Sequence, residues 1–370
     1  MVFGGARHLN LVAPLITGEA RAWPSPFSIA PVLAERGRSV AVLASGDPMW
    51  HGVGATLLRA VDVAETRIFP APSAFSLAAA RMGWPLAGAV TLSLHARPSA
   101  LLRPHLHDGA RLLVLTSDAA QPATIAALLA AEGFGESNVT LLEALGGPAE
   151  RIRGGIARDF APNDVHPLNT LGIEIVASRE ARILPRAPGL PDADFAHDGQ
   201  LTKREVRAIT LSALQPVPGA LLWDVGAGAG SIGIEWMLAH PTCRAIAIEG
   251  REDRAARITL NAEALGVPGM RIVTGEAPAA LAGLPRPDAV FLGGGANDPG
   301  VFDAALDALK PGGRFVANAV TLETEALLLA RRATLGGEML RIAISRAVPV
   351  AGMTGWRAAM PVTQWVWRKP

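Results

Sequence analysis

Hydrophobic and polar positions in the second half of the chain alternate between two patterns. Segments such as REDRAARITLNAEALG (251–266) and GVFDAALDALKPG (300–312) have apolar residues at helical spacing. Between such segments lie five short apolar runs of the kind that forms buried strands: ALLWDV (220–225), RAIAIE (244–249), RIVTG (271–275), DAVFLGG (288–294) and GRFVANAV (313–320). This alternation predicts an α/β fold with a parallel, doubly wound sheet that binds ligands at the carboxyl ends of its strands.

The boundary between the two halves is marked by proline and polar residues. LGIEIVAS (171–178) is predicted as the last strand of the first half, and LPRAPGLPDADFAHDG (184–199) follows it without apolar periodicity. We therefore expect a first domain over residues 1–184, a linker over 185–199 and a second domain over 200–370. TKREVRAITLSAL (202–214) is predicted to open the second domain as a helix, with Thr202 as its N-cap and Glu205 as capping-box partner.

Composition narrows the classes of protein that fit this pattern. With 370 residues, half of them hydrophobic and 18% charged, the chain can bury more than one core. A net charge of +1 without blocks of Lys and Arg does not indicate a nucleic-acid partner. The most apolar window, 219–239, contains Asp224, Glu235 and five glycines, which favours a buried strand, loop and helix over a membrane span.

The cysteine content bears on compartment and on metal chemistry. Cys243 is the single cysteine, so neither an internal disulfide nor a cysteine-based metal site is expected. No cluster of His, Asp and Glu shows metal-ligand spacing. Residues 1–30 also lack the basic and apolar pattern of a signal peptide. These features predict a cytoplasmic protein without a metal and without a membrane partner.

A glycine-rich stretch, WDVGAGAGSIGIE (223–235), directly follows the first strand of the second half. It matches G-x-G-x-x-G at Gly228, Gly230 and Gly233, and Glu249 closes the next strand 19 positions after Gly230. Close backbone approach together with a carboxylate for ribose hydroxyls would serve NAD or S-adenosylmethionine equally well. The glycines alone leave both cofactors open, and a purely structural turn as well.

Three features favour S-adenosylmethionine. Asp224 precedes Gly226 by two residues, where a carboxylate would attract an ammonium or sulfonium group and repel a pyrophosphate. The resulting D-x-G-x-G-x-G pattern, with LKPGGRFVANAV (309–320), resembles the Rossmann-like class I methyltransferases. In that superfamily a turn similar to GEAPAAL (275–281) holds the adenine, here through Gly275, Glu276 and Ala277.

The second half resembles one family more closely. HDGQLTKREVRAITLSAL (197–214), the glycines at 293–295 and LKPGGRFVANAVTLE (309–323) resemble the decarboxylating precorrin methyltransferase domain of corrin biosynthesis, over nearly all of residues 195–370. A generic methyltransferase would show only the glycine loop and the acid. The resemblance implies cofactor contacts from Thr202, Gly226, Ala227, Gly228, Ala229, Gly230, Glu249 and Ala277. A role of Thr202 as a helix cap is compatible with such a contact.

The first half resembles a second family. Gly46, Asp47 and Pro48 follow an apolar run, and FPAPSAFSLAAARMGWP (69–85) and LSLHARP (92–98) come next in the order found in tetrapyrrole methylases. Those proteins clasp S-adenosylmethionine between two α/β subdomains, and the resemblance implies that Gly46 and Asp47 contact the cofactor. Read alone, G-D-P indicates a simple turn.

One departure from the tetrapyrrole methylase pattern concerns the beginning of the chain. The family opens with a strand and a G-x-G-P-G loop, which this sequence does not show. We expect either a start some tens of residues upstream, the interpretation that we favour, or a truncated first domain.

Together the two resemblances imply one enzymatic activity. They imply S-adenosylmethionine-dependent methylation of a reduced precorrin-6 (precorrin-6B) at carbon 5 by the first domain and at carbon 15 by the second. Loss of the ring C acetate as carbon dioxide would complete the conversion to precorrin-8X in cobalamin (vitamin B12) biosynthesis. The alternatives are activity confined to the second domain, an NAD-dependent oxidoreductase, or a scaffold with vestigial sites.

The implied substrate is an acidic tetrapyrrole, so we expect basic residues in its pockets. The candidates are His95 and Arg97 near the first site and Arg357 near the second, although each is also compatible with a structural role. The resemblance further implies a homo-oligomer. The tail MPVTQWVWRKP (360–370) alternates like an edge strand that a partner could extend, or like an ordinary last strand of the sheet.

Overall fold

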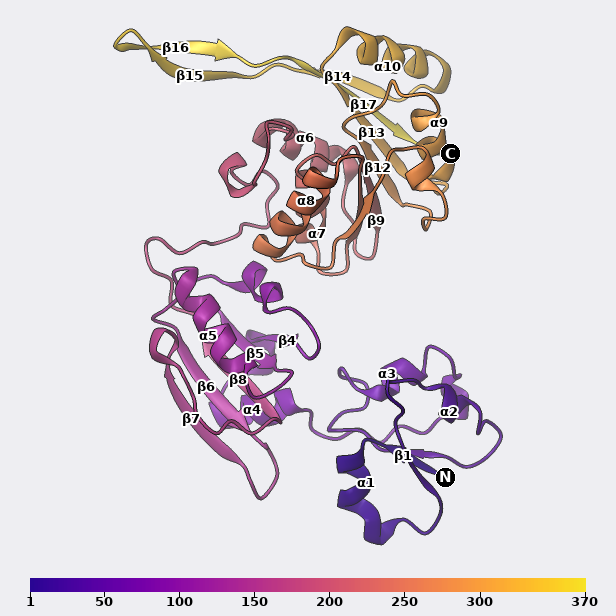
Figure 1. Cartoon of the computed structure of the whole chain (residues 1–370), viewed down its shortest axis with the longest axis vertical. Coiled ribbons are helices and arrows are strands. Elements are labelled where there is room, and N and C mark those ends of the chain that lie inside the picture. The colour runs from indigo at the N-terminus through magenta and orange to yellow at the C-terminus, as the bar shows by residue number, and fades with distance from the viewer. The chain divides into compact units, whose positions relative to one another are not determined.

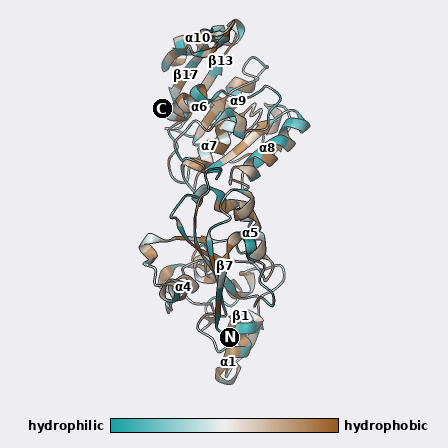
Figure 2. Ribbon diagram, turned by 90° about the vertical axis from the view of Figure 1, so that its left-hand side faces the viewer, coloured by the Kyte–Doolittle hydropathy of each residue, from teal (hydrophilic) through white to brown (hydrophobic).

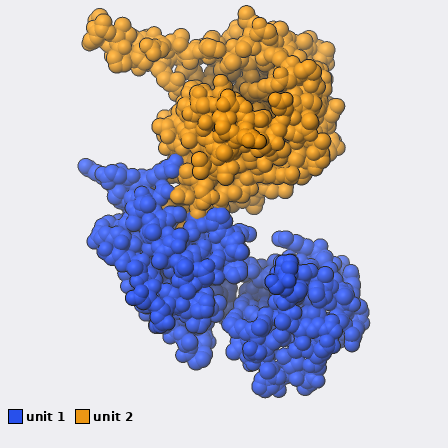
Figure 3. Space-filling view, in the orientation of Figure 1, with its two compact units in different colours: residues 1–99, 107–182 blue, residues 100–106, 183–370 orange.

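A computed structural model describes all residues from 1 to 370 (Figure 1). None of its helices combines the length and the apolar character needed to cross a membrane, and helices such as α8 (Glu252–Ala264) carry both polar and apolar residues (Figure 2). Contacts divide the chain into two compact units. Unit 1 comprises residues 1–99 and 107–182, and unit 2 comprises residues 100–106 and 183–370 (Figure 3).

Unit 1 contains a small parallel sheet near the beginning of the chain. Its strand order is β2-β1-β3, with both outer strands parallel to β1. Its elements are β1 (Val2–Gly4), α1 (Ala6–Val12), β2 (Ala20–Ala22), α2 (Ala30–Leu33), β3 (Ala41–Val42) and α3 (Val53–Leu57). The strands are only two or three residues long, and Phe3 at the centre is fully buried.

A larger mixed sheet completes unit 1, in the order β4-β5-β8-β6-β7. Strands β4 and β5 are parallel, and the other neighbours are antiparallel. The elements are β4 (Val90–Ser93), β5 (Arg111–Leu115), β6 (Asn138–Glu143), β7 (Arg151–Ile156), β8 (Asn169–Glu174), α4 (Ala74–Met82) and α5 (Gln121–Ala131). The strand predicted at 171–178 is confirmed as β8, and it lies inside the sheet between β5 and β6.

Unit 2 is built on a seven-stranded sheet in the order β11-β10-β9-β12-β13-β17-β14. The strands are β9 (Leu221–Val225), β10 (Arg244–Glu249), β11 (Arg271–Thr274), β12 (Ala289–Leu292), β13 (Arg314–Ala319), β14 (Glu338–Ile342) and β17 (Val362–Arg368). The helices besides α8 are α6 (Arg204–Leu214), α7 (Ser231–Ala239), α9 (Val301–Ala308) and α10 (Leu322–Leu335). The five strands from β9 to β13 are parallel and coincide with the five predicted runs, which confirms the doubly wound α/β fold.

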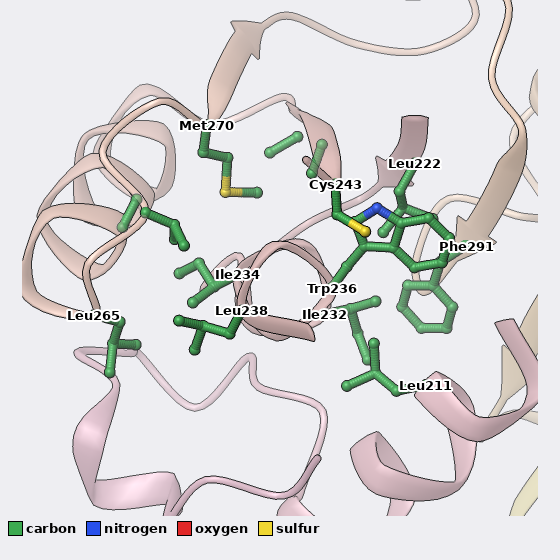
Figure 4. Packing of buried hydrophobic residues seen from close by; sticks show 14 of the residues in the cluster. Leu211, Leu222, Ile232, Ile234, Trp236, Leu238, Cys243, Leu265, Met270 and Phe291 are labelled. Atoms are coloured by element: carbon green, nitrogen blue, oxygen red, sulfur yellow. The ribbon is translucent and has the colours of Figure 1, made fainter. Parts of the chain in front are cut away.

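Apolar side chains cover both faces of this sheet. On one face, Leu211 of α6, Trp236 of α7 and Ile258 of α8 pack against strand residues such as Phe291 (Figure 4 shows the surroundings of Trp236). On the other face, α9 and α10 cover a cluster that includes Trp365. Burial on two sides explains why β9 to β13 read as nearly continuous apolar runs.

The Trp-rich tail takes a position that differs from one prediction. Strand β17 lies between β13 and β14 and is antiparallel to both, so neither of its edges is free. The prediction of an edge strand that a partner could extend is therefore wrong. The alternation arises because Trp365 faces the apolar core while the neighbouring Gln364 faces a buried polar cluster on the other side.

A two-stranded ribbon interrupts the chain between β14 and β17. It consists of β15 (Ser345–Val350) and β16 (Met353–Ala358), and Figure 1 shows it extending away from the sheet. Arg346 pairs with Arg357 across the two strands. The ribbon exposes several large apolar side chains, including Met353 and Trp356.

The segment before α6 belongs to unit 2 and packs against its core. Leu190 and Phe195 are buried in the same core as α7, although residues 185–199 contain only a short 3-10 turn, at Asp192–Asp194. The division by contacts falls between Arg182 and Ile183. Proline spacing thus marks the lack of regular structure here, while the isolated apolar residues mark the attachment to the domain that follows.

Candidate active site

A cavity of about 1070 Å³ lies at the carboxyl ends of the parallel strands of unit 2. One half is lined by the turn after β9, by the ends of β10 and β11, and by residues 199–203 before α6. The other half is lined by the glycines after β12 and by residues near β13, β14, β15 and β17. This is the edge of an open parallel sheet at which ligands bind.

In the turn after β9 the backbone lies very close to neighbouring segments of the chain. Gly226 has φ +70°, and a Cβ atom there would lie 2.9 Å from the carbonyl oxygen of Gly294. Gly228 has φ +58°, and its Cβ would lie 3.0 Å from the carbonyl oxygen of Gln200. A side chain at either position would strain the left-handed backbone and force the neighbouring chain to move. Gly226, Ala227 and Gly228 all line the cavity, as expected for a loop that lets a ligand approach the backbone.

Glu249 ends β10 and holds this loop from the adjacent strand. Its Oε2 accepts a hydrogen bond from the backbone N–H of Gly228 (2.8 Å), and its Oε1 accepts one from that of Arg251 (3.1 Å). The residue is largely buried and lines the cavity. Because a carboxylate offers about four acceptor positions, two remain for hydroxyl donors of a ligand.

Gly275, Glu276 and Ala277 follow β11 and line the same half of the cavity. The backbone N–H of Gly275 donates to the carbonyl oxygen of Glu249 (2.9 Å), which fixes this turn beside the end of β10. The structure therefore brings the predicted adenine turn, the glycine loop and Glu249 to one wall.

Asp224 lies below this wall and does not line the cavity. Its Oδ2 accepts a hydrogen bond from the backbone N–H of Gly233 in α7 (2.9 Å). Burial, with a smaller contribution from the charge of Glu249, raises the pKa of the Asp224 carboxyl to about 7, and the Gly233 hydrogen bond opposes the rise. The carboxyl connects β9 to the first turns of α7.

Ala229 and Gly230 also lie outside the cavity lining. The carbonyl oxygen of Ala229 accepts a hydrogen bond from Nδ2 of Asn261 in α8 (2.9 Å). Gly230 is the N-cap residue of α7, and a Cβ there would lie 2.6 Å from Cγ2 of Ile258. The last two residues of the predicted loop thus set how closely α7 and α8 pack.

Thr202 lines the cavity, but the prediction that it caps α6 is wrong. Lys203 is the N-cap residue and makes no capping bond with its side chain. The exposed N–H of Arg204 instead donates to Oδ1 of Asp192 (2.9 Å), and the Thr202 carbonyl accepts from the guanidinium of Arg207. The preceding chain passes over the helix start and supplies the cap from twelve residues away.

A buried ion pair that the sequence did not reveal holds this preceding chain. Arg207 in α6 is fully buried, and its Nε contacts Oε1 of Glu235 in α7 at 2.5 Å. Glu235 also accepts the backbone N–H groups of Gly189 (2.6 Å) and Leu190 (3.0 Å). The guanidinium carbon lies 4.7 Å from the ring centroid of Phe195. The sequence signal that could have revealed this ion pair is Arg207 itself, because it occupies a position of the helix at which the spacing predicts an apolar residue.

A buried polar cluster lies at the other half of the cavity. Asn318 of β13 lines the cavity, and its Nδ2 donates to Oγ1 of Thr210 (3.0 Å). Gln364 of β17 donates from Nε2 to both Thr210 Oγ1 (3.0 Å) and Asn318 Oδ1 (2.9 Å). These bonds fix the amide of Asn318 at the cavity wall. Sequence reasoning missed it because its partners come from α6 and β17, more than 40 residues away on either side.

The predicted substrate residue Arg357 is exposed on β16 and does not line the cavity. Its cross-strand partner Arg346 does line it. The glycines at 293–295, noted in the sequence as distinctive, line it as well. The basic residue that lines the cavity is therefore on β15, and Arg357 is its cross-strand neighbour on β16.

The predicted residues of the first half belong to unit 1. Gly46 and Asp47 follow β3, where Oδ1 of Asp47 accepts the backbone N–H of Met49 (2.8 Å) and so closes the turn. Gly46 has φ +57°, and a Cβ there would lie 2.9 Å from the carbonyl oxygen of Pro72. His95 and Arg97 are exposed just after β4. Each pair thus follows a strand that runs parallel to its neighbour, a position compatible with a ligand site.

Comparison with known proteins matches two segments of the chain to two families. Residues 193–369 match the family described as precorrin methyltransferase domain, and residues 26–160 match the tetrapyrrole (corrin/porphyrin) methylases. A "Precorrin-6Y C(5,15)-methyltransferase [decarboxylating]" of Sinorhizobium sp. is 60% identical over 100% of this chain and 90% of its own length. A protein of the same name from Mycobacterium tuberculosis (strain ATCC 25618 / H37Rv) is 43% identical over 99% of this chain and 92% of its own length.

One solved structure with a similar sequence covers half of this chain. The C-terminal domain of the precorrin-6Y C5,15-methyltransferase from Rhodobacter capsulatus has 50% sequence identity with this chain and covers 50% of it and 100% of that domain, with a TM-score of 0.48. The two relatives above align with the whole chain, from the first domain through the second. The chain therefore belongs to the family of precorrin-6Y C5,15-methyltransferases (decarboxylating).

Proposed function

We propose that this chain methylates a reduced precorrin-6 at carbons 5 and 15 and decarboxylates the ring C acetate, giving precorrin-8X in cobalamin biosynthesis. The observation that carries the proposal is the cavity of unit 2, whose lining includes both the glycine loop with Glu249 and the apolar side chains of Val206, Ile342 and Val362. The names of the relatives that align over the whole chain support the same reaction.

S-adenosylmethionine is the cofactor that we propose for this cavity. Gly226 and Gly228 leave no room for a side chain, and Glu249 keeps two acceptor positions for the ribose hydroxyls. Gly275, Glu276 and Ala277 would border the adenine, and Thr202 the opposite end of the cofactor. When bound, the cofactor supplies an electrophilic methyl group. Asp224, Ala229 and Gly230 would then act indirectly, by fixing the conformation of the glycine loop.

The remaining work of the protein is positioning. Val206, Ile342 and Val362 form an apolar cluster that reaches the cavity, and Asn318 presents a fixed amide beside it. Such a wall would exclude water and orient a carbon of the macrocycle toward the methyl group, which is how an enzyme lowers the entropy cost of a two-substrate reaction. Decarboxylation would draw on the macrocycle itself as electron sink.

We propose that the two halves divide the reaction. Residues 1–184 would methylate carbon 5 with a second cofactor at Gly46 and Asp47 and with His95 and Arg97 toward the substrate. Residues 200–370 would methylate carbon 15 and release carbon dioxide, with 185–199 as the connecting segment. Activity of the second domain alone is the alternative to this division.

Release of S-adenosylhomocysteine distinguishes these cases. The full chain is incubated with reduced precorrin-6 and excess S-adenosylmethionine, and the S-adenosylhomocysteine formed per substrate consumed is measured. Two equivalents support both domains, and one equivalent together with release of carbon dioxide supports the second domain alone. No release, together with binding of NAD in a calorimetric titration, would contradict the proposal and favour an oxidoreductase.

We also propose a cytoplasmic homo-oligomer. A single buried cysteine suits a reducing compartment. The exposed apolar residues Val350, Met353 and Trp356 of the β15–β16 ribbon are of the kind that subunit interfaces cover. Light scattering of the wild type and of Trp356→Ser tests this part: a single monomeric mass for the wild type would contradict it.

A further inference from the structure

The β15–β16 ribbon carries an unbalanced positive charge where it leaves the sheet. Residues 345–360 contain Arg346 and Arg357 and no acidic residue. The two arginines are cross-strand partners, so their side chains leave the same face of the ribbon. Like charges in such a pair repel each other, and an anion between or beside them relieves the repulsion.

Arg346 reaches the cavity from this position. It lines the half of the cavity formed by Ile342, Ile344, Asn318 and Val362. The other two basic residues of the lining have acidic partners outside the lining: Lys203 Nζ lies 3.9 Å from an Asp192 carboxylate oxygen, and Arg254 Nε donates to Asp198 at 2.8 Å. Arg346 is the basic residue that follows the apolar lining residues Ile342 and Ile344 along the chain.

The partner of Arg346 is a residue that a ligand could replace. Its guanidinium contacts the carboxylate of Glu205, in the first turn of α6. Both side chains are nearly half exposed, at 45% and 42%, so the ion pair is open to water and its net contribution to stability is small. A ligand carboxylate seated against the apolar wall would lie in a less polar environment and bind the guanidinium in a bidentate way.

We propose that Arg346 anchors a carboxylate arm of the tetrapyrrole substrate, and that Glu205 forms an ion pair with the Arg346 guanidinium only until the substrate displaces it. This assignment rests on the proposed function, and it names the residue that orients the macrocycle in the second domain. Arg357, on the same face of the ribbon, adds to the positive potential that attracts the substrate without lining the cavity.

Steady-state kinetics of three variants test the anchor. We expect Arg346→Gln to raise the KM for reduced precorrin-6 in the release of carbon dioxide at least tenfold while the Kd for S-adenosylhomocysteine, measured by calorimetry, changes less than twofold. The KM of Arg346→Lys should lie between those of the wild type and of Arg346→Gln, because an ammonium group keeps the charge but cannot form the bidentate pair. Glu205→Gln should lower the KM about two- to threefold, because the competing carboxylate is gone.

Arg341→Gln is the matched control. Arg341 lies on β14 five residues before Arg346, pairs with Glu325 at 2.7 Å and does not line the cavity. The KM of the Arg341→Gln variant should equal that of the wild type. Circular dichroism and the Kd for S-adenosylhomocysteine report whether each variant is folded.

The possible results separate the anchor from the proposed function. An unchanged KM in Arg346→Gln, with an active wild type, would overturn the anchor and leave the reaction in place. A parallel loss of S-adenosylhomocysteine affinity would also overturn it, since Arg346 would then hold the cofactor. A wild type that binds S-adenosylhomocysteine but consumes no precorrin would contradict the function on which the anchor depends.

Discussion

Two sets of charged side chains in unit 2 differ in what they contact. Asp224, Arg207 and Glu235 are buried among backbone groups and hold helices and loops in place. Glu249 and Arg346 line the cavity, and each has a partner but also capacity for a ligand. In the sequence all five are charged residues, and the local pattern does not distinguish the two sets. Only the direction of each side chain separates those that support the fold from those available for binding.

Removing the buried arginine should produce the largest effect on the fold. Arg207→Met leaves the carboxylate of Glu235 buried without its cation, and we expect the free energy of unfolding to fall by about 3–5 kcal/mol. Urea denaturation measures the change. Arg341→Met, which breaks an exposed pair with Glu325, is the control and should cost less than about 1 kcal/mol. Equal losses in the two variants would remove the distinction between buried and exposed charges.

The buried position of Asp224 should make the free energy of unfolding depend on pH. With a folded pKa of about 7 against an ordinary value of 3.8, the carboxyl stabilises the fold fully below pH 3.8, and this stabilisation is lost as the pH rises to 7. Asp224→Asn stays neutral, so its stability relative to the wild type should rise across this window by up to about 4 kcal/mol. Denaturation at several pH values measures it; a difference between the two proteins that is independent of pH would contradict the assignment.

Glu249 should affect ligand binding more than folding. Glu249→Ala removes the acceptors of the ribose hydroxyls and of the Gly228 N–H, and we expect the Kd for S-adenosylhomocysteine to rise about 10- to 100-fold. Calorimetry measures this, with Glu252→Ala on the exposed start of α8 as control. An unchanged affinity in Glu249→Ala would mean that the acid only supports the loop.

Thr202 should show the smallest effect on stability. Because Asp192 rather than Thr202 bonds the start of α6, Thr202→Ala should change the free energy of unfolding by less than about 0.5 kcal/mol. Asp192→Ala should cost about 1 kcal/mol or more, since it removes a cap and a partner of Arg207. Thermal denaturation of both variants compares them, and the reverse order would restore Thr202 as the cap.

Local pattern was sufficient to predict the sheet but not every partner in it. The five runs from 220 to 320 became β9 to β13 because burial on both faces leaves a clear apolar signal. The place of β17 between β13 and β14 depends on pairing with residues 338–342, which no local pattern specifies.

The candidate site divides in the same way. Gly226, Glu249 and Ala277 could be placed at one cavity because each lies at or just after the carboxyl end of a parallel strand, and such strand ends share one edge. The direction of Asp224 depends on the N–H of Gly233 in the next helix, and that of Arg346 depends on the return of the chain from the ribbon. Both required the fold itself.

The mass of the product formed from reduced precorrin-6 and S-adenosylmethionine tests the central claim most directly. The account predicts a product that has gained two methyl groups and lost one carbon dioxide, and a Glu249→Ala variant that accumulates a singly methylated, undecarboxylated product. An unchanged substrate mass in the presence of folded wild-type protein would contradict it.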